Sequence, residues 1–140
     1  MSKLFPTKSA EIIREFKGHN DEDGNWVEGD KKTIAEVEVD IQPKSGRRRA
    51  LELQTKYESE YIGFVDFEDI YVTVEALTIF GLTEHEQKVK YEDVYDDLNE
   101  LDIDLIHPGD VLDLIDSERE FNIVFPGAWE GDFELELKEL

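Results

Sequence analysis

The segment from Thr33 to Gln42 carries an apolar side chain at every second position, and this alternation constrains the fold more than any other feature of the sequence. Four apolar and four polar side chains take opposite faces: Ala35, Val37, Val39 and Ile41 on one, Glu36, Glu38, Asp40 and Gln42 on the other. Successive side chains of a strand point to opposite faces, so the pattern predicts a half-buried antiparallel strand with Val37 and Val39 in the core. Pro43 ends this ladder, because proline has no N–H to donate.

Other segments between turn residues are also typical of strands. We predict strands over Tyr57–Val65, Asp69–Phe80, Ile103–Ile106, Val111–Ile115, Glu120–Phe125 and a final segment with Phe133, Leu135 and Leu137 facing one way. His107–Asp110 predicts a turn, because Pro is followed by Gly. Ser9–Phe16 fits either a strand or one face of a helix. Lys17–Lys32 contains three glycines and is expected to be a loop or a hairpin around Trp26.

One segment has clear helical periodicity. From Lys90 to Leu101, apolar residues recur at spacings of three and four: Tyr91, Val94, Tyr95, Leu98 and Leu101. Arg47–Lys56 is expected to be a short helix or an ordered loop. The sequence therefore predicts a mostly β fold, a small antiparallel β-barrel or sandwich with one or two short helices. Residues 1–140 form one domain in this prediction, with an insertion around 66–106 that contains a helix at about 90–101.

The chain is strongly acidic, with a net charge of −21 at pH 7. Residues 1–70 carry 11 basic and 16 acidic side chains, net −5, whereas residues 71–140 carry 4 and 20, net −16. Such a surface repels free nucleic acid and anionic membranes and attracts basic protein surfaces. There is no apolar run near the ~20 residues that span a bilayer and no signal-peptide core, so we expect synthesis in the cytoplasm and no membrane partner.

The sequence offers no recognisable site for bond chemistry. It has no cysteine, and His19, His85 and His107 are not spaced as metal ligands or a catalytic triad. The acidic stretch from His19 to Asp30 resembles a calcium loop only in part, because the first and last ligands of an EF-hand are missing. Close carboxylate pairs arise by chance among 36 acidic residues. We therefore expect no enzyme, no metal, no cofactor and no small-molecule substrate.

The basic cluster Lys44, Arg47, Arg48 and Arg49 is the candidate interaction site. It could bind phosphate or an acidic neighbour, because the planar guanidinium binds oxyanions through two hydrogen bonds. Taken alone, the cluster fits a solubilising loop better. Because the chain already has an excess of charge, we favour contact with the acidic surface of a neighbouring subunit.

Several short motifs resemble those of one known family. They are Gly24–Gly29 (GNWVEG), the strand Ile34–Ile41, Gln42–Gly46 (QPKSG), His107–Val111 (HPGDV), Phe121–Val124 (FNIV), and Gly127–Leu137, which begins GAWEG. In this order they resemble the small head-closure proteins, also called neck or stopper proteins, of tailed bacteriophages and related prophages. The likeness covers about 80 residues in two blocks, and the segment from about Asp66 to Ile106 departs from it.

The resemblance implies a virion structural protein of the head–tail connector that performs no bond chemistry. Members form a homo-oligomeric ring below the portal and its adaptor, seal the DNA-filled head, and join it to tail proteins. The lumen passes double-stranded DNA without sequence-specific binding, and a lining of carboxylates would let the DNA slide. Two alternatives stay open: a tail terminator or other tail-side connector, and, in another class, a soluble acidic DNA mimic that inhibits a host DNA-binding protein.

Overall fold

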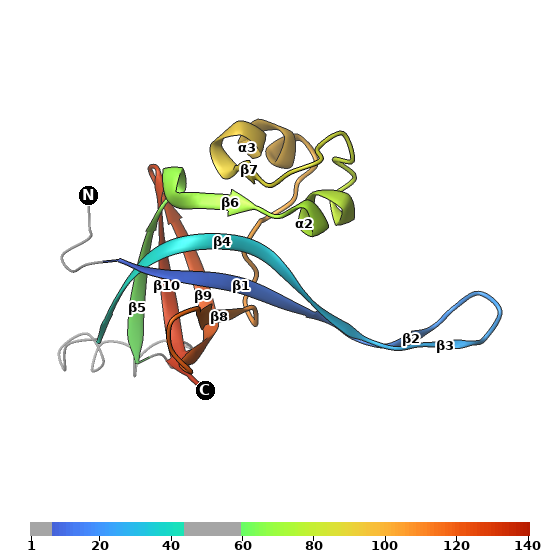
Figure 1. Ribbon diagram of the computed structural model, residues 1–140, viewed down its shortest axis with the longest axis horizontal. Helices are drawn as coiled ribbons and strands as arrows, with labels where there is room; N and C mark the ends of the chain where they lie inside the picture. Colours follow the sequence, from blue (N-terminus) through green and yellow to red (C-terminus); the bar gives the residue numbers. More distant parts are fainter. Residues whose placement is uncertain (1–6, 44–59) are drawn as a thin grey trace.

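The computed structural model describes residues 7–43 and 60–140, which form a β-barrel with a long two-stranded arm and a helical layer over one side (Figure 1). The described strands are β1 (Lys8–Phe16), β2 (His19–Asn20), β3 (Trp26–Val27), β4 (Asp30–Pro43), β5 (Tyr61–Asp66), β6 (Ile70–Val72), β7 (Val89–Lys90), β8 (Val111–Leu114), β9 (Glu120–Trp129) and β10 (Asp132–Glu139). The described helices are the 3-10 turn η1 (Phe67–Asp69) and the α-helices α2 (Val74–Ile79) and α3 (Tyr91–Glu100).

Six strands close into an antiparallel barrel in the order β1-β8-β9-β10-β5-β4, and the pairing of β1 with β4 completes the ring. This confirms the mostly β fold with short helices and selects the barrel over the sandwich. The barrel interior is filled by fully buried side chains: Ile12, Val39, Val65, Leu112, Phe121, Ile123, Leu135 and Leu137. Gly63 also lies inside, where an added Cβ would approach Val39 and Leu137 to 3.0 Å. The barrel at this level is therefore packed rather than hollow.

β4 follows the predicted alternation, since Ala35, Val37 and Val39 are buried and Pro43 is its last residue. The alternation is wrong about Asp40, which is fully buried instead of solvated. At Asp40, β4 begins to pair with β5, and Gln42 Nε2 donates a hydrogen bond of 3.0 Å to the Asp40 carboxylate. Alternation in the sequence predicts to which face of a strand a side chain points, but not which other segments cover that face.

The C-terminal half of the barrel agrees with its sequence patterns. β8 and β9 pair as the predicted hairpin, and Phe133, Leu135 and Leu137 point inward from β10. His107–Asp110 is the predicted turn: the Asp110 N–H donates to the His107 carbonyl at 3.1 Å, and Gly109 has φ of +94°. Only glycine adopts this backbone conformation without strain, which explains the Pro-Gly pair. Ser9–Phe16, whose sequence fits either a strand or a helix, lies in the strand β1.

The strand expected over Asp69–Phe80 is wrong beyond Val72. Only Ile70–Val72 pairs, as β6 on β4, and α2 follows at once. The Thr73 side chain caps α2 by accepting from the Ala76 N–H at 3.2 Å, and the helix ends at Ile79, followed by Phe80 and by Gly81, whose φ is +85°. A capping threonine and a terminal glycine define a helix despite its β-branched composition.

α3 confirms the predicted helix and buries Tyr91, Val94 and Leu98. The short strand expected over Ile103–Ile106 is wrong, because this segment pairs with no strand in the described residues. Leu105 and Ile106 are nevertheless buried, so their apolar character serves packing and not a ladder. In Figure 1 the segment from β6 to α3 lies over one side of the barrel, between β5 and β8 in the chain.

Candidate interaction surfaces

The predicted cluster Lys44, Arg47, Arg48 and Arg49 lies outside the described residues, as do the turn at 44–46, the segment Arg47–Lys56 and the start of the strand expected from Tyr57. The structure therefore leaves this contact site as a prediction. The described residues present three other candidate features.

The first of these is a hairpin arm, residues 17–31, that extends β1 and β4 beyond the barrel (Figure 1). Every residue from His19 to Lys31 is exposed. β2 and β3 pair at the outer part of the arm, with Asn20 opposite Trp26. The Trp26 side chain is 64% exposed.

The turn at the tip of the arm accounts for the partial likeness to a calcium loop. The Asp21 carboxylate accepts hydrogen bonds from the backbone N–H groups of Asp23 (3.0 Å) and Asn25 (2.8 Å). Gly24 completes the turn with φ of +81°. This is an Asx-type turn, in which the acidic side chain binds its own backbone. Alternating acidic residues before a glycine therefore serve to shape a hairpin here.

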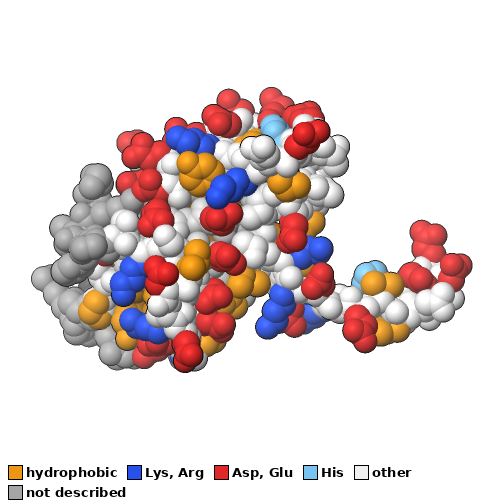
Figure 2. All heavy atoms as spheres, viewed as in Figure 1, with side chains coloured by type: hydrophobic (Ala, Val, Ile, Leu, Met, Phe, Trp, Pro, Cys, Tyr) orange, Lys and Arg blue, Asp and Glu red, His pale blue; other side chains and the backbone are white. Residues whose placement is uncertain are grey.

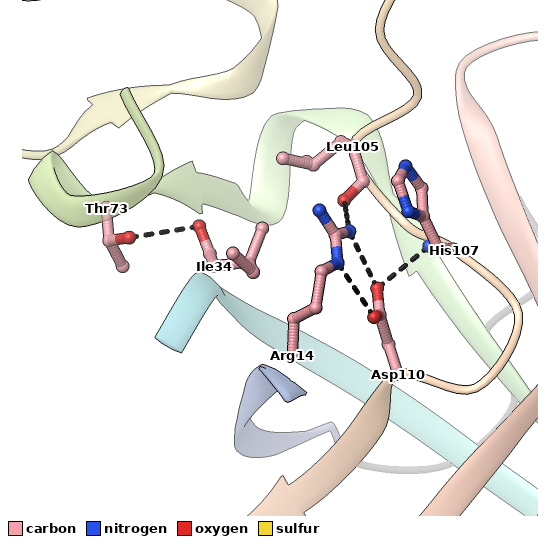
Figure 3. A network of polar contacts seen from close by, with 6 residues as sticks. All are labelled: Arg14, Ile34, Thr73, Leu105, His107 and Asp110. Carbon is pink, nitrogen blue, oxygen red and sulfur yellow. Dashed lines mark hydrogen bonds and ion pairs between the residues drawn. The ribbon is translucent and has the colours of Figure 1, made fainter. Parts of the chain in front are cut away.

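The second feature is a buried ion pair at the junction between the barrel and the helical layer (Figure 3). Arg14 on β1 donates through Nε and Nη2 to the two carboxylate oxygens of Asp110, each at 2.9 Å. Nη2 also donates to the Leu105 carbonyl, and the carboxylate accepts from the His107 N–H, both at 2.8 Å. The Arg14 side chain is 13% exposed and that of Asp110 3%. This satisfied network ties β1, where the arm begins, to the turn that leads into β8.

The third feature is an aromatic pocket, a cavity of about 370 Å³ between α3, the segment after it, and β9–β10. Its walls include Phe67, Tyr91, Tyr95, Phe125 and Phe133. Three of these rings pack around Phe67, with centroids 5.2 Å away in Tyr91, 5.7 Å in Tyr95 and 4.9 Å in Phe133.

The mouth of the aromatic pocket is open and partly polar. Tyr95 and Phe125 are 38% and 39% exposed, and the rim includes Asn99 and Asp104. Burial, together with neighbouring Tyr95 and Asp104, raises the pKa of Tyr91 to about 12. The pocket therefore offers aromatic surface below and a hydrogen-bond acceptor at the rim, which suits a side chain with an apolar body and a polar N–H or O–H.

Charge is distributed unevenly over these features. Figure 2 shows basic side chains where the arm leaves the body and acidic ones at its tip. The basic residues at the arm's base are Lys17, Lys31 and Lys32, and those at the tip are Asp21, Glu22 and Asp23. The solvent side of α3 is acidic throughout, with Glu92, Asp93, Asp96, Asp97 and Glu100 exposed. The molecule thus has lysines interspersed with acidic side chains at the base of the arm, where Lys32 Nζ lies 3.6 Å from Asp30 Oδ2, and an acidic helix beside the aromatic pocket.

A larger cavity of about 440 Å³ beside β4 is lined by Ser9, Glu36, Lys88 and others. Lys88 Nζ lies 3.2 Å from Glu36 and 5.2 Å from the ring centroid of Tyr71. The three histidines lie apart in the chain, His19 in the arm, His85 between α2 and β7, and His107 in the turn before β8. Among the described residues, no group of three or more His, Asp or Glu side chains could hold a metal ion.

In the ranges 7–43 and 60–140, no helix is long and apolar enough to cross a membrane. Comparison with protein-family models, with curated proteins and with solved structures returned no match.

Proposed function

We propose that this chain is a structural component of the head–tail connector of a tailed bacteriophage or prophage. In this proposal, copies form a ring below the portal and adaptor, close the DNA-filled head, and join it to the tail. The observation that carries the proposal is the exposed arm on a closed barrel. The ring of six strands has no free edge, so copies would assemble through side-chain surfaces, through the short edge strand β7, or through a projecting segment. The arm is such a segment, and it buries nothing on its own body.

The charge supports a role next to DNA without binding to it. A net charge of −21 repels the phosphate backbone, and most of it is carried by residues 71–140. Carboxylates facing a channel would keep DNA from adhering during ejection. Of the motifs that resemble those of head-closure proteins, Gly24–Gly29 lies in the arm, Ile34–Ile41 in β4, His107–Val111 at the turn before β8, and the last two on β9–β10, whereas Gln42–Gly46 extends beyond the described residues.

Electron microscopy tests the proposal directly. The chain should be expressed with its genomic neighbours, and purified particles should show a ring of it at the portal vertex of DNA-filled heads. Particles made without the chain should lose their DNA. Complete, DNA-retaining particles in its absence would overturn the proposal. A ring at the end of the tail tube would instead identify a tail terminator.

The basic cluster gives a second experiment. Replacing Arg47, Arg48 and Arg49 together by serine should leave the barrel folded and reduce ring formation or particle completion, because these arginines are proposed to bind the acidic surface of a neighbouring subunit or of the adaptor. Circular dichroism would check the fold. Normal assembly by the folded variant would remove the cluster from the proposal.

A soluble DNA mimic is the second candidate, and the acidic face of α3 favours it. Its carboxylates repeat at spacings of three and four, as on one face of a helix. A mimic would bind a basic host protein as a monomer or dimer and would be absent from particles. Pull-down with a lysate, followed by competition with double-stranded DNA for the captured protein, would distinguish this role from a connector.

A further inference from the structure

The aromatic pocket leaves two of its rings accessible to another molecule. Tyr95 on α3 and Phe125 on β9 are exposed and come from different elements, whereas Tyr91 and Phe133 are buried. Phe67 packs against Tyr95, with ring centroids 5.7 Å apart. The face of an aromatic ring carries partial negative charge and attracts a cation that lies within about 6 Å of its centroid. The pocket therefore combines apolar walls with ring surface that favours a positive charge.

The rim of this pocket is acidic. Asp104 is exposed and belongs to the lining, and among the described residues no Lys or Arg lines the pocket. After burial and Tyr95, Asp104 is the third cause of the raised pKa of Tyr91, so its negative charge acts inside the pocket. Glu92 lies three residues before Tyr95 on α3, a spacing that places two side chains beside each other on a helix. A cation bound at Tyr95 would therefore have two carboxylates close to it.

An acidic hollow adjoins the aromatic pocket. It is a cavity of about 440 Å³, and Phe67 lines both cavities. Apart from Phe67 and Gly131, its lining consists of four acidic residues: Asp66, Glu68, Glu92 and Asp132. Asp66 lies directly opposite Asp132 in the pairing of β5 with β10. Like charges opposite each other in a sheet are destabilising, so a cation placed beside them is favoured.

The basic side chains described near these cavities have other partners or other places. Arg14 donates to the Leu105 carbonyl at the pocket, but its guanidinium is paired with Asp110 at 2.9 Å. Lys90 immediately precedes α3 and lines the separate cavity beside β4. Within residues 7–43 and 60–140, the two cavities therefore have a carboxylate lining with no cation of their own. The net charge of −21 also attracts basic proteins from a distance.

An arginine suits the aromatic pocket better than a lysine does. Its guanidinium is flat and weakly hydrated, so it stacks on ring faces, and its N–H groups form a fork that pairs with a carboxylate such as Asp104. Lysine carries a compact and strongly hydrated charge, which costs more to remove from water. The cavity of about 370 Å³ has room for the guanidinium and for the apolar stem behind it.

We propose that the aromatic pocket binds an arginine from a basic segment of a partner protein, while a second basic side chain of that segment lies in the acidic hollow. Phe67, which lines both cavities, separates the two cationic positions. The inference goes beyond the proposed function and does not rest on it, because the site belongs to a single chain and is complete in a monomer or in a ring.

Fluorescence anisotropy with synthetic peptides measures this binding. The probe is a labelled peptide of repeated Gly-Ser-Arg units, and the comparison peptide has lysine in place of arginine, so that both carry the same charge. The full-length protein should bind the arginine peptide more tightly by about threefold or more. Equal affinity for the two peptides would mean that the net charge alone attracts them, and would overturn the inference.

Substitutions locate the site. Tyr95→Ala should weaken binding of the arginine peptide by about 2- to 30-fold, the range of a cation–π contact, whereas Tyr95→Phe keeps a ring and should retain the affinity. Trp26→Ala removes an exposed ring on the arm and should change nothing. Asp104→Asn should weaken binding more than Asp116→Asn, which makes the same charge change in the exposed turn between β8 and β9. Circular dichroism checks that each variant is folded.

The remaining outcomes each decide the inference. Equal losses for Asp104→Asn and Asp116→Asn, or unchanged affinity in Tyr95→Ala, would overturn it. An affinity that rises when Arg47, Arg48 and Arg49 are replaced by serine, but not when Tyr95→Ala is also present, would show that the chain's own cluster fills the pocket. That result would overturn the assignment to a partner protein.

The peptide experiment and the particle experiment can fail separately. A chain that forms connector rings but does not distinguish the arginine peptide overturns this inference and leaves the proposed function. Selective binding of the arginine peptide, together with complete particles in the absence of the chain, overturns the proposed function and supports this inference.

Discussion

Removal of the Asp110 carboxylate should be among the most damaging single changes to this fold. Asp110→Ala leaves the Arg14 guanidinium largely buried without its partner, since that side chain is only 13% exposed. It also leaves the His107 N–H without the acceptor that now lies 2.8 Å away. Breaking one side of a buried ion pair costs about 3–5 kcal/mol, and the slight exposure of Arg14 favours the lower end, about 3 kcal/mol.

Urea denaturation followed by circular dichroism measures this effect. For a urea dependence of about 2 kcal/mol per M, a loss of about 3 kcal/mol lowers the unfolding midpoint by about 1.5 M. Asp110→Asn should fall between parent and Asp110→Ala, because the amide keeps one oxygen acceptor but lacks the negative charge that faces Arg14.

The matched control is the ion pair of Arg119 with Glu139, whose Nε–Oε2 distance is 2.8 Å. Its side chains are 40% and 34% exposed, so solvent screens the attraction. Glu139→Ala should therefore lower the urea midpoint much less than Asp110→Ala does. Equal midpoints for Asp110→Ala and the parent, or equal losses for Asp110→Ala and Glu139→Ala, would refute the argument that burial makes the Arg14–Asp110 pair essential.

Three further predictions follow from individual side chains. Val39→Asp places an unpaired charge in the barrel and should abolish folded protein, whereas Glu38→Gln should change the urea midpoint little; equal effects would mean that the register of β4 is wrong. Thr73→Ala removes the α2 cap and should cost about 1 kcal/mol by urea denaturation, whereas Thr73→Ser should retain most of that stability. The folded-state pKa of Tyr91, about 12, lies above the ordinary tyrosine pKa of 10.0, so its contribution to stability is complete below pH 10.0 and is lost as pH rises to about 12. The Tyr91→Phe variant should therefore lose less stability than the parent between pH 10.0 and about 12. An unchanged dependence of stability on pH would contradict the raised pKa of Tyr91.

The sequence predicted those elements whose signal is local. β4, α3, the His107–Asp110 turn and the β8–β9 hairpin each carry their periodicity or their turn residues within one segment. The sequence predicts a strand after Val72, because valine, threonine and isoleucine favour strands. The structure has the helix α2 there, and this helix depends on one capping residue and one terminal glycine. Here the end signals outweighed the composition.

The candidate surfaces were harder to predict because each joins distant parts of the chain. Arg14 and Asp110 are 96 residues apart, and no local pattern marks them as partners. The rings of the aromatic pocket come from η1, α3, β9 and β10, which only the fold brings together. The hairpin around Trp26 was one of two expected structures, but its projection from the barrel is a property of how β1 and β4 extend beyond their neighbours.

Salt dependence provides a last test, because two electrostatic effects oppose each other in self-association. Copies with a charge of −21 repel one another, and this repulsion is screened over ~8 Å at physiological ionic strength. The proposed contact of Arg47, Arg48 and Arg49 with an acidic neighbouring surface is attractive but involves only a few charges at close range. The overall repulsion should dominate, so sedimentation should show monomers at low salt and stronger association as salt rises. Oligomers that instead dissociate as salt is added would mean that attractive pairs between subunits outweigh the net charge, contrary to this reasoning.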